Sequence, residues 1–452
     1  MTALLDFLTR WVGTMAKKTV VREQPLVIAI TGSVGKSSTK QLIAAMLHAS
    51  QDKTVRVTQK NYNNELGLPC TIFDCAPPGR SPLLWLSFLW TAFLHGYGFR
   101  STGVRTLVLE MGADHPGDLA YLTDIAPPSL SVVTAVTPES SDWAPVHAAN
   151  YSSTKAVAEE KATIVRRVAK TGAIILNSDD THVIPMRHET EAHLVTFGTT
   201  EAADVHILQT HIRLEQTSTG AMPTGLEVRL SIGHKVHSAF LPGVYGRSLA
   251  FSLAAAACVG MALDLTTEEI IAACTAEYRP LPGRVRLIPG IKGTMLFDDS
   301  YNASPASVVS SMRDLSTISL DRSQQRKIVC LGEMRELGPD AESLHERIGI
   351  EAAHFGFDGL VFTGVYAQAY ARGAKLAGMP EERTHVFEDT PELGLWLQKN
   401  LRPGDLILAK ASEGTIATKG VRMERVIKEL MAEPARAEEL LCRQGGAWGV
   451  RK

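Results

Sequence analysis

The sequence predicts an α/β fold in which a mainly parallel sheet is covered by helices. Short apolar runs alternate with longer segments of helical periodicity, and this alternation is typical of such a sheet. The chain has 452 residues, of which 45% are hydrophobic, so it is long enough for two or three packed domains. The runs expected to form strands of the first sheet are 26–30, 107–109, 132–134 and 173–176.

Two changes of pattern divide the chain further. Between about 206 and 241 polar and apolar residues alternate, which predicts antiparallel strands with one solvated face and hence a β insertion or subdomain. The run Tyr-Arg-Pro-Leu-Pro-Gly at 278–283 breaks any helix, and strand and helix patterns resume after it. We therefore expect an N-terminal arm at 1–24, a central domain at 25–280, a C-terminal domain at 281–435 and a loosely structured tail at 436–452.

Charge and cysteine content exclude several classes of protein. The 46 Lys and Arg nearly balance the 48 Asp and Glu, so the net charge of −2 predicts no broad surface for nucleic acid or an anionic membrane. The six cysteines include no C-x-x-C pair, which argues against a zinc site and indicates reduced thiols. Residues 1–19 lack the apolar core of an export signal, so we expect a cytoplasmic protein.

One apolar stretch, 83–94, needs a separate explanation. It contains no charged residue, but it is too short to span a bilayer, and we expect no transmembrane segment. A buried helix is one interpretation of this stretch. The other is a helix that contacts a membrane surface or a lipid substrate.

A glycine-rich segment at 31–38, Thr-Gly-Ser-Val-Gly-Lys-Ser-Ser, lies between a predicted strand and a predicted helix, which is the context of a phosphate-binding loop. Glycines let backbone N–H groups approach phosphate oxygens, and the helix N-terminus favours negative charge. Position 30 is Ile, so the loop is a shortened variant without the usual first glycine. The nucleotide-binding residues expected here are Gly32, Ser33, Val34, Gly35, Lys36, Ser37 and Ser38.

Within this loop, Lys36 is expected to neutralise the β- and γ-phosphate oxygens, and the Ser37 hydroxyl to ligate Mg²⁺. Mg²⁺ beside phosphate also needs a carboxylate. The run Thr-Leu-Val-Leu-Glu-Met-Gly at 106–112 places Glu110 at the end of a neighbouring strand, and we predict that it binds the metal. A solvated charge at the rim of the sheet is the alternative for Glu110.

These and further motifs give the sequence a resemblance to the Mur ligase family over most of its length, nearest to the branch that adds a dipeptide to a peptidoglycan precursor. The resemblance implies a central ATP-binding domain and a C-terminal Rossmann-like domain that carries the incoming amino acid or dipeptide. ATP would bind between the two, and closure would assemble the site. The motifs, in the order of the family, are 31–37, 61–69, 110–117, 125–128, 177–180, 282–284, 298–305 and 331–338, with His345 beyond.

The resemblance also implies roles for single residues. In the family, a lysine downstream of the metal-binding glutamate is commonly carbamylated and binds a second Mg²⁺, and Lys161 matches it. His147 is a candidate ligand of the same metal, with a surface histidine as the alternative. Lys36, Lys161 and His147 form the expected catalytic set. Residues that match ATP contacts are Arg284, Asp299, Tyr301 and Asn302, and those expected at the substrate are Asn63, Asn64 and Lys410.

The chain departs from the family pattern at three places that concern substrates. Only about 24 residues precede the first strand, where the family carries a domain for a uridine nucleotide. We therefore expect a different acceptor, a protein partner in place of that domain, or an acceptor that contacts the apolar stretch 83–94. The adenine-contacting stretch G-x-H-N-x-x-N corresponds to 242–252, which has neither His nor Asn, and Lys-Gly-Ser-Arg appears as Lys-Ala-Ser-Glu at 410–413.

We predict an ATP-dependent, ADP-forming ligase that activates a carboxylate as an acyl phosphate and couples it to an amine. Its expected substrates are a peptidoglycan-type precursor and an amino acid or dipeptide. A Mur-like ligase for another amino-acid or peptide product is one alternative. A nucleotide-driven regulatory protein that has lost ligation, or a structural partner in a cell-wall complex, is another, although the retained Lys36, Ser37, Glu110 and Lys161 argue for catalysis.

Overall fold

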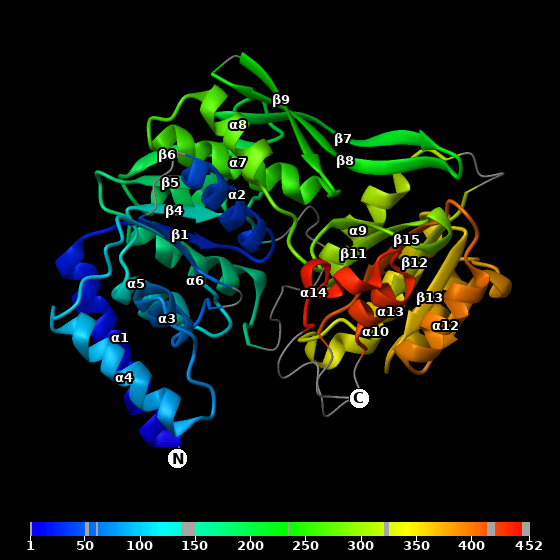
Figure 1. The fold of residues 1–452 in the computed structure, drawn as a ribbon. Helices are drawn as coiled ribbons and strands as arrows, with labels where there is room; N and C mark the ends of the chain where they lie inside the picture. Colours follow the sequence, from blue (N-terminus) through cyan, green and yellow to red (C-terminus); the bar gives the residue numbers. More distant parts are fainter. Residues whose placement is uncertain are drawn as a thin grey trace.

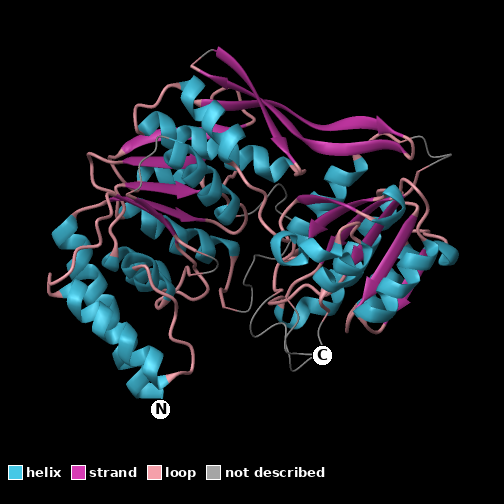
Figure 2. Ribbon diagram, in the orientation of Figure 1, coloured by secondary structure: helices cyan, strands magenta, loops and turns pink. Residues whose placement is uncertain are grey.

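The computed structural model describes residues 2–49, 54–59, 62–136, 150–233, 235–320, 325–413 and 421–444. These residues fold around two sheets, one of nine strands and one of six (Figure 1). Helices lie on both faces of each sheet, as the colouring by secondary structure in Figure 2 shows. The predicted α/β class with mainly parallel sheets is confirmed.

The first sheet has the strand order β2-β3-β1-β4-β5-β6-β7-β8-β9. The pairs from β2 to β7 are parallel, and the last two pairs are antiparallel. Its strands are β1 (Leu26–Thr31), β2 (Val55–Val57), β3 (Thr106–Glu110), β4 (Leu130–Val133), β5 (Ala173–Asn177), β6 (His193–Gly198), β7 (Val205–Thr217), β8 (Gly220–Ile232) and β9 (Lys235–Pro242).

Strand β1 shows why the sheet is covered on both faces. Ile28 and Ile30 belong to one apolar core, whereas Val27 and Ala29 belong to the core on the opposite face. Such a continuous apolar run is typical of a parallel strand buried on both sides. The helices of this part are α1 (Thr2–Glu23), α2 (Lys36–Ala49), α3 (Gly67–Phe73), α4 (Pro82–Gly96), α5 (Asp118–Ile125), α6 (Thr154–Arg166), α7 (Arg247–Ala262) and α8 (Thr267–Glu277).

The second sheet has the order β10-β11-β15-β12-β13-β14, in which only the β10–β11 pair is antiparallel. Its strands are β10 (Arg286–Pro289), β11 (Met295–Asp299), β12 (Lys327–Leu331), β13 (Gly359–Thr363), β14 (Thr384–Phe387) and β15 (Leu406–Lys410). The helices around it are α9 (Pro305–Ser316), α10 (Ala341–His354), α11 (Ala367–Leu376), α12 (Thr390–Asn400), α13 (Met423–Leu430) and α14 (Ala437–Leu440). Short 3₁₀ turns lie at Ile184–His188, Ile291–Gly293, Gly338–Asp340, Glu381–Arg383 and Pro434–Arg436.

The antiparallel strands expected at 206–241 are present as β7, β8 and β9, and they extend the edge of the first sheet. The long β7–β8 hairpin reaches across to the second sheet (Figure 1). There the Gln325 side chain accepts a hydrogen bond from Ala221 N at 3.0 Å and donates to Gly404 O at 2.9 Å. A buried amide with both ends paired therefore ties the hairpin to the second half of the molecule.

Two expectations about single segments need correction. The tail is not loose over its described part, because Leu440 and Leu441 belong to the apolar core of the second half and Cys442 is buried. The apolar stretch 83–94 is helical, in α4, but only its Phe88 and Ala92 face is buried. The interpretation of α4 as a buried helix is therefore wrong for most of its surface. Within the described ranges, no helix combines the length and the apolar character needed to cross a membrane.

Candidate active site

The glycine-rich loop joins the end of β1 to the start of α2. A Cβ atom added to Gly32 would lie 1.9 Å from the Thr134 hydroxyl oxygen, so only glycine fits at this position. Gly35 has a φ of 84°, a conformation that favours glycine. Both glycines are therefore required by the local geometry, which brings the loop close to the end of β4.

The loop offers donors that suit an anion. The Ser33 hydroxyl is buried and has no hydrogen-bond partner among the described residues. The first backbone N–H group of α2 that bonds back within this segment is that of Thr39, which donates to Gly35 O at 2.9 Å. The N–H groups that precede it in the helix point out of the helix N-terminus, where a ligand can accept them. The Lys36 amine donates to Gly32 O at 2.6 Å and so lies over the loop. Such an arrangement binds phosphate.

Glu110 lies at the end of β3, directly beside α2. Ser37 Oγ is 3.0 Å from Glu110 Oε2, and the Lys40 amine is 2.9 Å from the same oxygen. Burial raises the pKa of this carboxyl group. The charges of Lys40 and Lys36, followed by Arg284, outweigh burial and hold its pKa below the usual range. Glu110 is therefore an anion at neutral pH, and it is not the rim charge of the alternative interpretation, because it is buried.

A hydroxyl group and a carboxylate side by side are suitable donors for Mg²⁺. Mg²⁺ prefers oxygen ligands and usually binds one or two carboxylates together with phosphates and waters. The described residues contain no group of three or more His, Cys, Asp or Glu side chains that would hold a metal by themselves. The pair Ser37 and Glu110 therefore fits a cation that arrives with a phosphate ligand.

Lys161 lies on α6 and is almost completely buried. Burial, followed by the charge of Lys36, lowers the pKa of Lys161 to about 7. The adjacent Glu160 fixes the helix, because its carboxylate accepts hydrogen bonds from Gly117 N and Leu119 N, both at 2.9 Å. This amine is thus held in place close to the loop.

Two charged residues at this end of the sheet were not predicted from the sequence. Lys40 pairs with Glu110. This pairing could have been predicted from the sequence, because Lys40 lies three residues after Ser37 and therefore on the same face of α2. Asp114 raises the pKa of both Lys36 and Lys161, so its carboxylate lies near the two amines. Asp114 lies inside the motif 110–117, but the spacing of the motif does not show that its side chain points toward Lys36 and Lys161.

Arg284 belongs to the second half of the molecule, yet its charge acts on Lys36 and Glu110. Its guanidinium carbon lies 4.0 Å from the centre of the Tyr301 ring, a cation–π contact. Arg443, from the segment predicted as a tail, also faces this ring at 5.1 Å and donates to Ser300 O at 3.2 Å. No sequence signal pointed to Arg443.

Asp299, Asn302 and Lys410 come together at the end of β11 and β15. The Lys410 amine is 2.5 Å from Asp299 Oδ2 and 3.0 Å from Asn302 O. Ser311 Oγ donates to the same Asp299 oxygen at 2.7 Å. Lys410, expected at the substrate, is therefore a buried partner of the expected ATP contact Asp299.

The remaining predicted residues are placed as follows. Asn63 O accepts a hydrogen bond from Gly112 N at 2.9 Å, close to Glu110. Asn64 Oδ1 accepts from Gly67 N at 2.9 Å, so this side chain supports the start of α3. His147 lies outside the described residues, and its role as a metal ligand stays a prediction.

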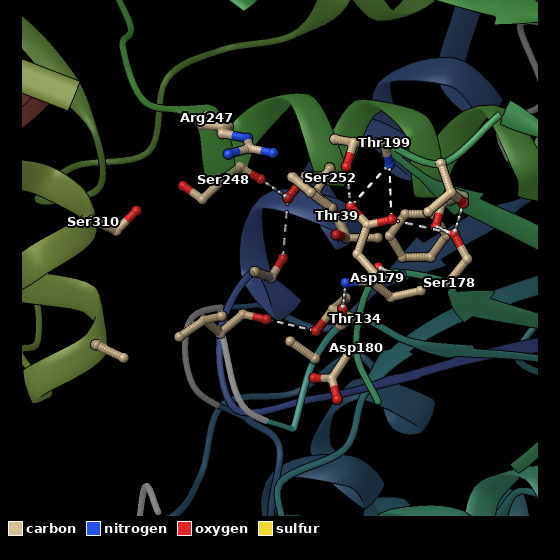
Figure 3. A pocket seen from close by; sticks show the side chains of 18 of the residues that line it. Thr39, Thr134, Ser178, Asp179, Asp180, Thr199, Arg247, Ser248, Ser252 and Ser310 are labelled. Atoms are coloured by element: carbon tan, nitrogen blue, oxygen red, sulfur yellow. Dashed lines mark hydrogen bonds between the residues drawn. The ribbon is translucent and has the colours of Figure 1, made fainter. Parts of the chain in front are cut away.

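A cavity of about 500 Å³ opens beside the loop, between α7 and α9. Figure 3 shows Arg247 and Ser248 on one side of it, Ser310 of α9 opposite, and Thr134 and Asp179 at the strand ends. The cavity is thus lined by both halves of the molecule. The segment that lacks the family's His and Asn still contributes to it, through Arg247, Ser248, Phe251 and Ser252.

Some polar groups that line this cavity already form hydrogen bonds with other protein groups. Both Asp179 carboxylate oxygens accept from Thr199 N at 2.9 Å, and one of them accepts from Thr199 Oγ1 at 2.6 Å. The Arg247 guanidinium lies 5.7 Å from the centre of the Phe251 ring. The volume suits a nucleoside-sized group, and the lining offers two aromatic rings, Phe197 and Phe251, two guanidinium groups, Arg247 and Arg313, and several hydroxyls.

Comparison with known proteins gives the same picture at the level of sequence and fold. The family described as the Mur ligase middle domain matches residues 30–259, and the Mur ligase, glutamate ligase domain matches residues 283–413. A Mycobacterium tuberculosis protein named UDP-N-acetylmuramoyl-tripeptide D-alanyl-D-alanine ligase is 31% identical over 404 residues, which cover 85% of this chain and 70% of that protein.

Solved structures show the same fold. MurF from Acinetobacter baumannii has a TM-score of 0.70 at 21% identity, over 89% of this chain and 77% of that one. MurF from Thermotoga maritima, solved in complex with ADP, has a TM-score of 0.68 at 21% identity, over 95% and 84% of the two chains. At these identities the similarity concerns the fold.

Proposed function

Because the chain belongs to the Mur ligase family, we propose that it is an ATP-dependent, ADP-forming ligase that joins a carboxylate to an amine. The observation that carries this proposal is the gathering of Lys36, Ser37 and Glu110 at one phosphate loop, with Lys161 close by. Arg284, from the other half of the molecule, adds a positive charge to this site. Phosphoryl transfer needs such a concentration of cations, because charge spreads over the transferred oxygens in the transition state.

The position of the nucleotide follows from the same groups. Its triphosphate would lie along the loop and the start of α2, with Mg²⁺ on Ser37 and Glu110, and we call this the phosphate side. Its base would occupy the cavity lined by Arg247 and Phe251, which we call the base side. Mg²⁺, when bound, neutralises phosphate charge and orients the oxygens for transfer.

We propose that Lys161 is carbamylated, which would turn a buried amine into a second carboxylate for the metal site. Three observations support this. The Lys161 side chain is buried, its helix is fixed through Glu160, and its lowered pKa leaves much of the amine uncharged at neutral pH. Only an uncharged amine reacts with CO₂. His147 is the proposed ligand beside it.

The acceptor carboxylate would take the γ-phosphoryl group to give an acyl phosphate, which the incoming amine attacks with release of phosphate. Lys36 and Arg284 offset the repulsion between the two anions that meet in the first step. The Asp299 and Lys410 pair lies at the ends of β11 and β15, in the second half of the molecule. There it would fix the backbone of the residues that surround the incoming amine. Positioning of this kind supplies much of the rate of a two-substrate reaction.

We infer substrates from the named relatives. They support a peptidoglycan-type precursor as the acceptor and D-alanyl-D-alanine as the incoming dipeptide. The position of Asn63 next to Gly112, on the phosphate side, supports a contact with the acceptor. A partner protein that contributes further acceptor contacts stays a prediction.

The test is phosphate release from ATP in the presence of Mg²⁺ and bicarbonate, against a panel of carboxylate acceptors combined with D-alanyl-D-alanine or single amino acids. We expect release only with a matched acceptor and amine, and its loss in Lys36→Ala by roughly a thousandfold. Lys170→Ala is the matched control, because Lys170 is an exposed partner of Glu191.

Three outcomes decide the proposal. Release that requires both substrates, and a product with the mass of the amide, support the ligase. Release that ignores acceptor and amine would favour a nucleotide-driven regulatory protein, and release retained in Lys36→Ala would reject the assignment of the loop.

A further inference from the structure

The helix pair formed by α1 and α4 carries an apolar surface that the active site does not use. Six large apolar side chains in the first turns of the two helices are between 47% and 78% exposed. A folded protein rarely exposes so many large apolar groups in one place unless they contact something. We call these residues the tip: Leu4, Leu5, Phe7, Leu83, Leu84 and Leu86.

Packing of the pair brings the two first turns to the same end. Gly96, near the end of α4, lies against Met15 in the second half of α1, and Arg22 donates to Gly96 O at 3.4 Å. From this contact both helices run back about 20 Å to their first residues, at 1.5 Å per residue. Figure 1 shows the pair side by side, with the N-terminus of the chain at the far end from the sheet. The tip therefore projects from the body.

An aromatic belt follows the tip along the pair. Phe93 stacks on Trp90 at 5.5 Å between ring centres, and it also contacts Tyr97 at 4.9 Å and Phe99 at 5.8 Å. Trp90, Tyr97 and Phe99 are all more than half exposed. The Lys18 amine lies 4.8 Å from the centre of the Tyr97 ring, so a cation adjoins the belt.

The two helices and their flanking segments carry more cations than carboxylates, although the whole chain has a net charge of −2. One of these cations, Lys17, pairs with Asp124 of α5 at 2.7 Å. Residues 2–23 and 76–109 together contain seven Lys and Arg against two Asp and Glu. Residues 76–109 contain no acidic residue at all. The net charge of the whole chain therefore does not describe this surface, where cations outnumber carboxylates.

We propose that the helix pair docks on an anionic membrane surface, with the tip in the outer hydrocarbon region. The arrangement along the pair carries this inference, because the large apolar side chains gather at the tip, the aromatic belt comes next, and Lys18 and Arg100 lie beyond it. Asp6 lies between the tip residues of α1, and Arg80 precedes those of α4. A bilayer presents hydrocarbon, interface and anionic headgroups in the same order. A protein partner would match the apolar area, but it would not require this sequence of layers.

The experiment is flotation of the full chain with vesicles of phosphatidylcholine alone and of phosphatidylcholine with 30% phosphatidylglycerol, roughly the anionic content at which surface charge attracts basic proteins. We expect binding to the anionic vesicles, at least tenfold stronger than to the neutral ones and weakened by salt. Leu83→Glu/Leu86→Glu should lower this binding at least tenfold. Lys18→Ala/Arg100→Ala should lower it for anionic vesicles only.

Leu376→Glu/Leu395→Glu is the matched control, because these exposed leucines lie on α11 and α12 of the other half. Absence of binding by the unaltered chain, or equal binding by the tip variant, would overturn the proposal. A dimer that the tip variant splits, without vesicle binding, would assign the tip to a second copy instead. The tip variant should keep the ATP turnover of the unaltered chain without vesicles, so this test is independent of the proposed function.

Discussion

On the phosphate side, the groups expected from the sequence meet around one loop. On the base side, the His and Asn of the family pattern are absent, and a cavity is nevertheless present. Lys36, Ser37, Glu110 and Lys161 represent the first side, and Arg247 with Phe251 the second. Phosphate and Mg²⁺ require particular charges and oxygen donors. A base is held by flat or cationic surfaces of suitable size, so its pocket tolerates other residues.

The largest effect should come from Glu110→Gln. The amide keeps the shape of the side chain but loses the charge that pairs with Lys40 and that is proposed to bind Mg²⁺. We expect Mg²⁺-dependent phosphate release to fall by roughly 100- to 1000-fold, measured over a titration of Mg²⁺. Glu191→Gln, at an exposed ion pair, is the control. A variant with an unchanged Mg²⁺ requirement would remove Glu110 from the metal site.

The second-largest effect should come from Lys161→Arg. We expect phosphate release to fall by roughly 10- to 100-fold, because arginine keeps the positive charge but cannot be carbamylated. The lowered pKa of Lys161, about 7, means that the uncharged amine becomes more abundant as pH rises through 7. At constant dissolved CO₂, the ¹³C NMR signal of a carbamate should therefore be stronger at pH 8 than at pH 6.

The control for this variant is Lys155→Arg, on the exposed face of the same helix α6. It should keep both the carbamate signal and the activity. A carbamate signal that survives in Lys161→Arg would place the modification elsewhere.

On the base side, Arg247→Ala should raise the KM for ATP by about tenfold, since loss of a stacking guanidinium costs on the order of 1–3 kcal/mol. The kcat should stay within about twofold, because the phosphate side is intact. Arg187→Ala, at an exposed position, is the control. A fall in kcat with an unchanged KM would contradict the separation of the two sides.

The smallest effect on activity should come from Thr199→Val. Valine removes the hydroxyl that donates to Asp179, while the Thr199 backbone N–H remains as a donor. We expect a KM for ATP within about twofold and a free energy of unfolding lower by about 1–2 kcal/mol, measured in urea. A much larger change in the KM for ATP would show that Asp179 contacts the base of the nucleotide.

Much of the phosphate side followed from the sequence, because each of its signals is local. A strand, two glycines and a helix in succession predict a loop whose N–H groups face one point, and Ser37 and Lys36 are part of it. Glu110 followed from its place at the end of a parallel strand, since such ends meet at one edge of the sheet. The domains to which these segments belong were predicted from hydrophobic periodicity.

The opposite holds for contacts between residues that are far apart in the sequence. The Arg284 and Glu110 interaction, the position of Arg443 over Tyr301 and the pairing of Gln325 with Ala221 depend on how two sheets are packed. No spacing rule encodes that packing.

The sequence by itself determined the fold class, the phosphate loop and the residue types of the metal site, because strand ends and helix starts fix side chains within a few residues. Tertiary structure decided which charges face one another, and it decided that α4 is a surface helix. The apolar composition of the 83–94 stretch predicts that part of it is buried. Which face of the helix is buried depends on how the neighbouring helices pack against it.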